Sequence, residues 1–248
     1  MSSKSSAPPA RWAGADGSPG GWVLAALDAS RSLLALRLVK TFAELAVEVA
    51  PLSLTLVDIP IGLPSAEWPH DRQCDGMARS LLGPRASSVF PVPAREAAWA
   101  ESYEAAGTLN REILRRGLSR QSWNICPKIR DADAVFRMVP GLQQRVRETH
   151  PELCFWLLND GHPLETPKKS PAGIRVRREL LRSWIPNLDA ALRLARRAYP
   201  ASRVGPDDLL DAAAAAMVAS LAAEGRAASV PLAPERDACG LAMEIVGS

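Results

Sequence analysis

The feature that most constrains the fold of this chain is a largely apolar run, Leu52–Asp58, that ends in an acid. Such a run is typical of a strand that is buried on both faces of a sheet. A helix precedes it, because Thr41 and Glu44 form a capping box and Pro51 ends the helical spacing. A buried strand that is reached through a helix predicts an α/β fold.

Three further strands are expected before that helix, at Arg11–Asp16, Gly21–Asp28 and Leu33–Lys40. The links between them are short and rich in Gly, Pro and Ser, which predicts an antiparallel meander. The element order is therefore β-β-β-α-β. The right-handed crossover rule places the fourth strand beside the first, so we expect a mixed sheet flanked by helices.

The remainder of the chain is mostly helical in pattern. Expected helical segments are Asp71–Leu82, Arg95–Arg115, Asp131–Arg145, 173–185, 188–198 and Asp207–Glu224, and short strands are expected at Arg145–His150 and Leu241–Val246. We interpret residues 1–10 as a disordered tail and 11–248 as a single domain. Residues 59–145 form a helical insertion after the fourth strand, and we expect this insertion to cap the site.

Composition narrows the class of protein. The chain has 248 residues, 47% of them hydrophobic, and a net charge of +3, which permits a nucleic-acid partner without requiring one. No secretory signal and no membrane-length apolar stretch is apparent, so we expect no membrane partner. Four cysteines without a CxxC pair favour a reduced, cytoplasmic protein. A homodimer remains open.

Three acids stand at informative places: Asp16, Asp58 and Asp211. Asp16 precedes Gly17, and Asp-Gly is a favoured turn pair, so a turn is its simplest explanation. Asp58 ends a buried strand, where a carboxylate is costly unless it is paired or binds metal. Asp211 interrupts the apolar surface of a helix. The acids one turn before it have a simple explanation, because an N-cap and the helix dipole both favour acids there.

Taken together, these positions predict a site. Acids at the ends of the first and fourth strands and on the last long helix are the pattern of an RNase H-like fold, in which carboxylates hold two divalent ions. Hard oxygen ligands favour Mg²⁺ or Mn²⁺. Glu152 and Asp207 are candidate further ligands. The expected activity is phosphodiester hydrolysis by a metal-dependent nuclease acting on a nucleic acid.

The chain also resembles a known family. The motifs that carry the resemblance are Gly14–Gly17 with Gly21-Trp22, Val57–Pro64, Arg72–Asp75 with Ala78-Arg79, Arg85–Pro91, Lys128-Ile129 with Asp133, Glu148–Glu152, and Asp207-Asp208 with Asp211-Ala212. They are similar to those of DUF429, a family of predicted nucleases of RNase H fold, over about residues 11–246.

This resemblance implies a metal cluster of Asp16, Asp58 and Asp211, with Glu152 or Asp207 as a further ligand. The last helix is also similar to that of RuvC-type Holliday-junction resolvases. Those resolvases usually carry Glu where this chain has Asp58, and the shorter side chain would draw the metal toward the fourth strand or loosen the site.

Basic residues of the insertion are candidate substrate contacts. The candidates are Arg72, Arg79, Arg85, Arg95 and Lys128. Arginine offers bidentate geometry for phosphate. The alternative for each is an ordinary ion-paired or solvated helix face.

Three rival interpretations stay open at this point. An actin-like phosphotransferase or ATPase could use the Asp16-Gly-rich hairpin to hold phosphate. A zinc module could use the two His-x-x-x-Cys pairs, His70 with Cys74 and His150 with Cys154. A non-catalytic RNase H-like scaffold would bind a partner without chemistry.

Overall fold

The structure is a computed structural model that describes residues 9–248. The expected tail lies almost wholly outside the described residues, and the two of its residues that are described, Pro9 and Ala10, have no regular secondary structure.

The described residues contain a mixed five-stranded sheet and a separate hairpin. The strands are β1 (Trp12–Ser18), β2 (Gly21–Leu27), β3 (Leu33–Val39), β4 (Leu54–Asp58), β5 (Val146–Glu148), β6 (Ser229–Arg236) and β7 (Ala242–Val246). The sheet order is β3-β2-β1-β4-β5, with β6 and β7 forming the hairpin. The first three strands are antiparallel, whereas β4 runs parallel to β1 and β5. The expected place of the fourth strand beside the first is confirmed.

Helices make up most of the remaining described chain. They are α1 (Phe42–Val49), α2 (Gln73–Leu82), α3 (Arg95–Ala98), α4 (Tyr103–Leu114), α5 (Arg120–Met138), α6 (Pro151–Leu158), α7 (Pro171–Arg182), α8 (Leu188–Ala198) and α9 (Pro206–Ala223), with 3₁₀ turns at Gly83–Ser88 and Leu142–Gln144. None of the helices in residues 9–248 combines the length and apolar character that a membrane span requires.

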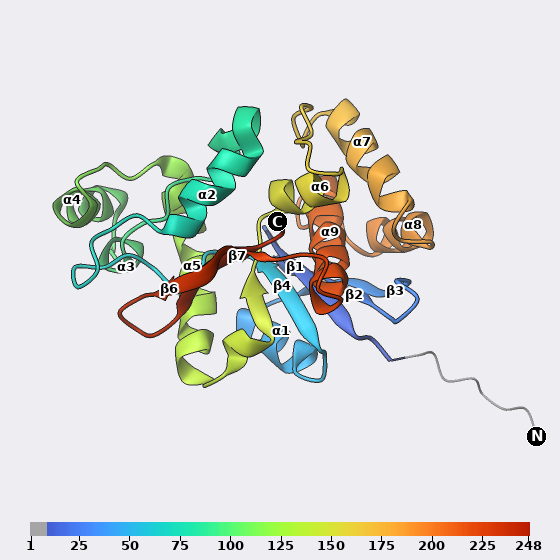
Figure 1. The fold of residues 1–248 in the computed structure, drawn as a ribbon, viewed down its shortest axis with the longest axis horizontal. Coiled ribbons are helices and arrows are strands. Elements are labelled where there is room, and N and C mark those ends of the chain that lie inside the picture. The colour runs from blue at the N-terminus through green and yellow to red at the C-terminus, as the bar shows by residue number, and fades with distance from the viewer. Residues whose placement is uncertain (1–8) are drawn as a thin grey trace, which may run out of the picture.

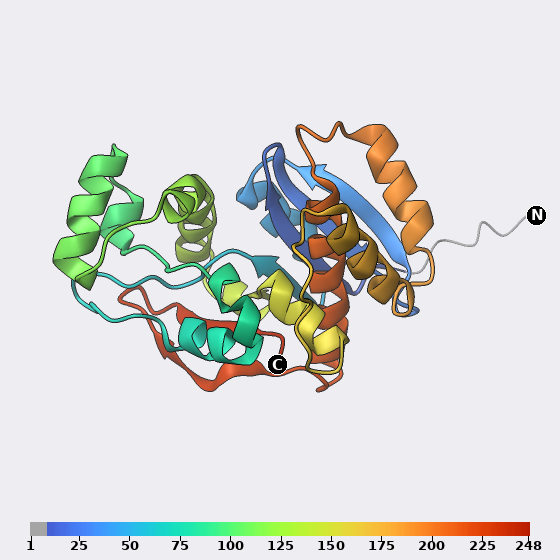
Figure 2. The same ribbon diagram turned by 90° about the horizontal axis from the view of Figure 1, so that it is seen from above.

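The sheet lies between two helical layers, as expected for an α/β fold (Figures 1 and 2). One face packs against α9, with α6, α7 and α8 around it. The other face packs against α1 and the apolar side of α5. In Figure 1, α3 and α4 stand away from the sheet on the left, and α7 and α8 lie on the right. This mixed sheet flanked by helices is consistent with an RNase H-like fold.

Two helix boundaries differ from expectation. The segment expected as one helix, Arg95–Arg115, is two, because Ser102 caps a new helix by accepting a hydrogen bond from the Ala105 N–H. The third helix, expected from residue 131, begins at Arg120 and continues through Pro127. Ser119 caps its start, and its apolar side is buried against the sheet, which outweighs the disruption that proline causes within a helix.

The closest approach between sheet and helix occurs at Gly14 in β1. A Cβ atom there would lie 2.2 Å from the Ala216 backbone nitrogen and 2.3 Å from the Ala212 carbonyl oxygen. Only glycine allows this contact, because any other side chain would push α9 off the sheet. The contact fixes the height of α9 above β1 next to the acids.

Candidate functional site

Three predicted acids converge on one end of the sheet. In the parallel register of β1 and β4, Asp16 pairs with Asp58, so the two carboxylates stand side by side. Alternate residues of β1 pack against α1 and α5, which directs Asp16 toward α9. Asp211 lies in the second turn of α9 and is completely buried. The three acids that interrupt apolar patterns in the sequence therefore lie close together in the structure.

The cluster is strongly electronegative. Burial raises the pKa of Asp16 well above its usual value, and the nearby Asp58 and Asp211 raise it further. Burial likewise raises the pKa of Asp211, to about 6, although the ammonium of Lys168 opposes this shift. No hydrogen bond within residues 9–248 reaches the carboxylate of Asp16 or Asp58. The cluster thus holds more negative charge than its protein partners neutralise.

Lys168 is the cation that the described residues place in the cluster. Its ammonium donates to Asp211 Oδ2 over 2.7 Å, and attraction to Asp211 raises the pKa of the ammonium. The other Asp211 oxygen, Oδ1, is buried and has no hydrogen-bond partner. Sequence reasoning missed Lys168 because it lies in a loop without periodicity, 43 positions from its partner.

Asp16 and Asp58 open onto a cavity of about 690 Å³, which we call the central cleft, whereas the buried Asp211 does not line it. Both the sheet and the insertion line it. From the sheet side come Asp16, Gly17, Asp58, His150, Pro151, Glu152, Lys168, Lys169, Asp207 and Asp208, and from the insertion come Arg85, Ser88, Phe90, Gln121, Asn124, Ile125 and Lys128. The insertion therefore walls the site on one side, as a cap would. Its helix α5 also covers the opposite face of the sheet, which was not expected.

The additional acids have different surroundings. Asp207, in the first turn of α9, lines the central cleft close to the cluster. Asp208 accepts a hydrogen bond from the Gly205 N–H over 2.7 Å and so caps the helix. Glu152 also lines the cleft, but both of its oxygens accept from Arg177 Nη2, at 2.7 and 2.9 Å. That pair neutralises Glu152, whereas Asp207 makes no ion pair within residues 9–248.

Two of the predicted substrate contacts lie elsewhere. Arg72 is fully buried, and its guanidinium pairs with Asp75 and Glu148. Arg79 donates from Nε to the Val89 carbonyl over 3.0 Å and does not line the cleft. Arg72 therefore joins the insertion to β5, and Arg79 forms a contact within the insertion. The expectation that they contact substrate is corrected accordingly.

Two of the remaining three candidates do lie in the central cleft. Arg85 faces it with one amino group 3.4 Å from Glu152. Lys128 reaches across from α5 to the β1–β2 hairpin, where its ammonium donates to the Gly21 carbonyl over 2.6 Å and lies over the Trp22 ring. Burial lowers the pKa of Lys128. Both cations line the same cleft as Asp16 and Asp58.

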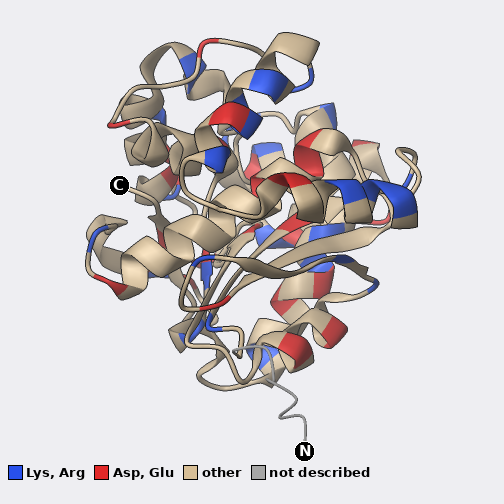
Figure 3. Ribbon diagram, turned by 90° about the vertical axis from the view of Figure 1, so that its right-hand side faces the viewer, with Lys and Arg blue, Asp and Glu red and all other residues tan. Residues whose placement is uncertain are grey.

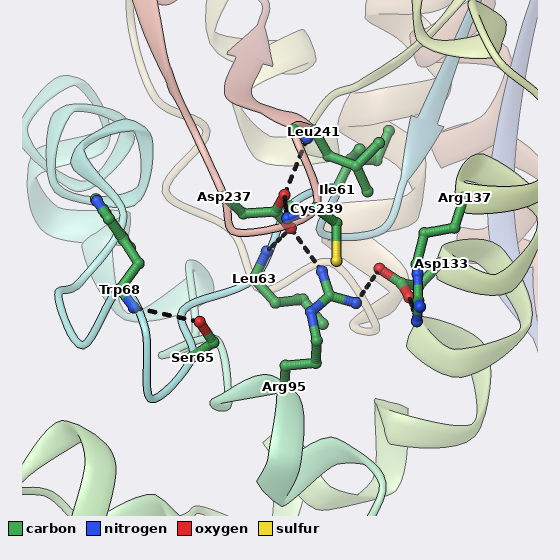
Figure 4. A network of polar contacts seen from close by, with 12 residues as sticks. Ile61, Leu63, Ser65, Trp68, Arg95, Asp133, Arg137, Asp237, Cys239 and Leu241 are labelled. Atoms are coloured by element: carbon green, nitrogen blue, oxygen red, sulfur yellow. Dashed lines mark hydrogen bonds and ion pairs between the residues drawn. The ribbon is translucent and has the colours of Figure 1, made fainter.

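Arg95 belongs to a structural network rather than to the cleft (Figure 4). Its guanidinium bridges Asp133 of α5 and Asp237, which follows β6. Asp237 in turn accepts from the Leu63 and Leu241 N–H groups, at 3.0 and 2.9 Å. The network joins α3, α5 and the β6–β7 hairpin, so Arg95 is not available to a substrate.

The structure also bears on two alternatives. Asp16 pairs with Val23 within the β1–β2 ladder, so it is not the turn residue that a simple Asp-Gly reading requires. His70 is exposed against the Trp68 ring, whereas Cys74 is completely buried, so they do not face a common ion. Within residues 9–248, in the present side-chain positions, no group of three His, Cys, Asp or Glu residues could hold a metal ion.

The fold and the site together define an α/β protein with a mixed five-stranded sheet, consistent with an RNase H-like fold, and with carboxylates gathered where β1 and β4 end. The chain belongs to DUF429, described as a protein of unknown function, whose family model matches residues 14–236. Comparison with curated proteins and with solved structures gave no match.

Proposed function

We propose that this protein is a divalent-cation-dependent hydrolase of phosphodiester bonds, with nucleic acid as its substrate. The observation that carries the proposal is the convergence of Asp16, Asp58 and Asp211 at one end of the sheet, where Asp16 and Asp58 line the central cleft. Neighbouring strand ends and a helix start supply these carboxylates from distant parts of the chain. Such convergence is expected of a cation site and is not needed for stability.

The charge of the cluster supports a cation. Three carboxylates surround one ammonium, that of Lys168, and burial makes their mutual repulsion costly. A folded protein keeps such an arrangement at the expense of stability when function requires it. Mg²⁺ or Mn²⁺ would balance the remaining negative charge.

The donor set fits these ions. All three side chains offer hard carboxylate oxygens, and Asp211 Oδ1 is buried without a partner. Asp16, Asp58 and Asp211 would hold the ion, with Asp207 beside them. When bound, it would polarise a phosphoryl oxygen and lower the pKa of a bound water. The present side-chain positions form no complete ligand group, and the bond of Lys168 to Asp211 takes up one of the carboxylate oxygens.

The cleft residues have separate tasks in this proposal. Arg85 and Lys128 line the cleft from the insertion, where they would bind and orient the phosphates that flank the scissile bond. Lys169 adds a cation at the same opening. Lys168 restrains the Asp211 carboxylate through their ion pair. Walls from both the sheet and the insertion limit access of bulk water to the acids.

The proposal is tested by hydrolysis of bis(p-nitrophenyl) phosphate and of labelled DNA and RNA oligonucleotides, with Mg²⁺, Mn²⁺ or EDTA. We expect cleavage that EDTA abolishes. Asp16→Asn and Asp211→Asn should each lower the rate more than about a hundredfold, since even residues outside the ligand shell contribute 10–100-fold at metal sites.

The matched control is Asp160→Asn, the same chemical change at an exposed turn with a φ of 53°, which asparagine tolerates. It should keep full activity. Equal rates in all variants, or rates unaffected by EDTA, would contradict the proposal. ATP turnover that depends on Asp16 would instead favour the phosphotransferase alternative.

A further inference from the structure

A second charged surface lies outside the central cleft. The segment 168–203 contains ten Lys and Arg residues and only two acids, a net charge of +8, whereas the whole chain carries +3. The rest of the molecule is therefore acidic. Figure 3, which faces this side of the protein, shows Lys and Arg recurring along its helices. Most of this positive charge belongs to α7 and α8.

The arginines follow helical spacing and flank a groove. Arg175, Arg178 and Arg182 are exposed along α7, at intervals of three and four residues. On α8, Arg193, Arg196 and Arg197 repeat this spacing. Between the helices lies a cavity of about 290 Å³. Arg178, Arg193, Arg196 and Arg197 surround this cavity, and Ile174, Leu192, Leu209 and Leu210 form its apolar part. We call it the α7–α8 groove.

Within residues 9–248, four of the ten cations of the segment 168–203 form ion pairs, and two of these four, Lys168 and Arg177, pair with Asp211 and Glu152. Asp189 pairs with Arg178 and with Arg182, at 2.8 and 3.3 Å. Within residues 9–248, Arg193 and Arg197 are exposed and make no ion pair or side-chain hydrogen bond. An ordinary solvated helix face mixes both signs of charge. Unpaired charges of one sign repel each other, so this surface favours an anionic partner.

The groove and the central cleft are both lined by the start of α9. Pro206, the first residue of α9, lines the groove, and the next two residues, Asp207 and Asp208, line the cleft. Lys168 and Lys169 line the cleft just before α7 begins. The first turn of α9 therefore lines both the groove and the cleft, and the lysines that precede α7 place positive charge in the cleft.

We propose that the α7–α8 groove binds the phosphate backbone of a nucleic-acid strand that extends out of the central cleft. The inference rests on the proposed function for the identity of the strand. Arginine forks suit phosphate oxygens, and an apolar floor suits the faces of sugars and bases. A concave groove between two helices fits a strand better than it fits a flat membrane surface.

The test measures binding without cleavage. A fluorescein-labelled single-stranded oligonucleotide is titrated with the protein in EDTA, and anisotropy is followed at several salt concentrations. Arg193→Gln/Arg197→Gln should weaken binding by roughly tenfold or more. It should also reduce the slope of log K against log salt by about 1.4, since two phosphate contacts are lost.

A matched control removes the same charge elsewhere. Arg111→Gln/Arg115→Gln changes two exposed arginines at the end of α4 and should bind like the unmodified protein. Thermal melts verify that both variants are folded. Equal affinities and salt slopes for the two variants would overturn the proposal, as would equally strong competition by polyglutamate or by anionic vesicles.

The binding titration and the hydrolysis assay together distinguish failure of the groove proposal from failure of the proposed activity. If the unmodified protein does not hydrolyse phosphodiesters but the groove variant alone loses oligonucleotide binding, the proposed activity fails and the groove stands. If hydrolysis occurs but the groove variant binds normally, the groove proposal fails and the activity stands.

Discussion

At the scale of single residues, Asp16 shows how function and stability oppose each other. A buried carboxylate needs hydrogen bonds or a counter-charge, and Asp16 has instead two other acids as neighbours. Lys168 bonds to Asp211 rather than to Asp16. The carboxylate of Asp16 is therefore buried without a hydrogen bond or ion pair within residues 9–248, and its effect on stability depends on pH.

The pH dependence follows from the raised pKa of Asp16. Below its ordinary value of 3.8 both folded and unfolded chains hold the proton. At higher pH the unfolded chain loses it first, so the folded state is progressively destabilised until Asp16 ionises there too. We expect Asp16→Asn to melt at a higher temperature than the unmodified protein in EDTA, with a difference that grows from about pH 4 upward. A difference that shrinks as pH rises would contradict the assignment.

The residue scale also marks a limit of sequence reasoning. Asp16, Asp58 and Asp211 could be identified because each interrupts an apolar pattern in a strand or helix. Arg72 and Lys168 could not be assigned correctly. A buried arginine in an ion pair and an exposed one have the same sequence signature, and pairing of loop residues depends on tertiary structure alone.

At the scale of elements, the position of α9 on β1 determines whether the acids meet. Gly14 allows that contact because it lacks a side chain. The place of β4 beside β1, the approximate strand ends and α9 were predictable from periodicity and from the crossover rule. The start of α5 was not, because Pro127 ends a helix in most contexts and here lies inside one.

Gly14→Ala tests the role of this contact. The added methyl group would meet the backbone of Ala212 and Ala216, which cannot move independently of α9. We expect the free energy of unfolding to fall by about 1–3 kcal/mol or more. Gly76→Ala, in α2 with no atom within 4 Å of the added carbon, should instead raise it by roughly 0.5–1 kcal/mol. Urea denaturation of both variants measures these free energies of unfolding. Equal effects in the two variants would contradict a close contact between Gly14 and α9.

At the scale of the whole molecule, buried ion pairs join the insertion to the sheet. Arg72, at the start of α2, pairs with Glu148 at the end of β5. Arg95 links α3 to α5 and to the residue after β6. These pairs hold the wall of the central cleft that carries Arg85 and Lys128 in a fixed position relative to the acids. A cleft between two parts of a chain requires such connections to keep its shape.

Arg72→Gln tests this connection. The substitution leaves the buried Glu148 without its guanidinium, and unpaired buried charges cost about 3–5 kcal/mol in stability. Arg37→Gln breaks the exposed pair with Glu48 and should cost only about 0–1 kcal/mol. Chemical denaturation provides both values, and similar losses in the two variants would show that the buried pair is not a main connection.

Calorimetric titration of Mn²⁺ into the protein tests whether Asp16, Asp58 and Asp211 form a cation site. The titration requires no assumed substrate. We predict binding by the unmodified protein and by the exposed-turn control Asp160→Asn, and loss of that binding in Asp16→Asn and in Asp211→Asn. Absence of Mn²⁺ binding in the unmodified protein, or unchanged binding in all variants, would contradict this cation site.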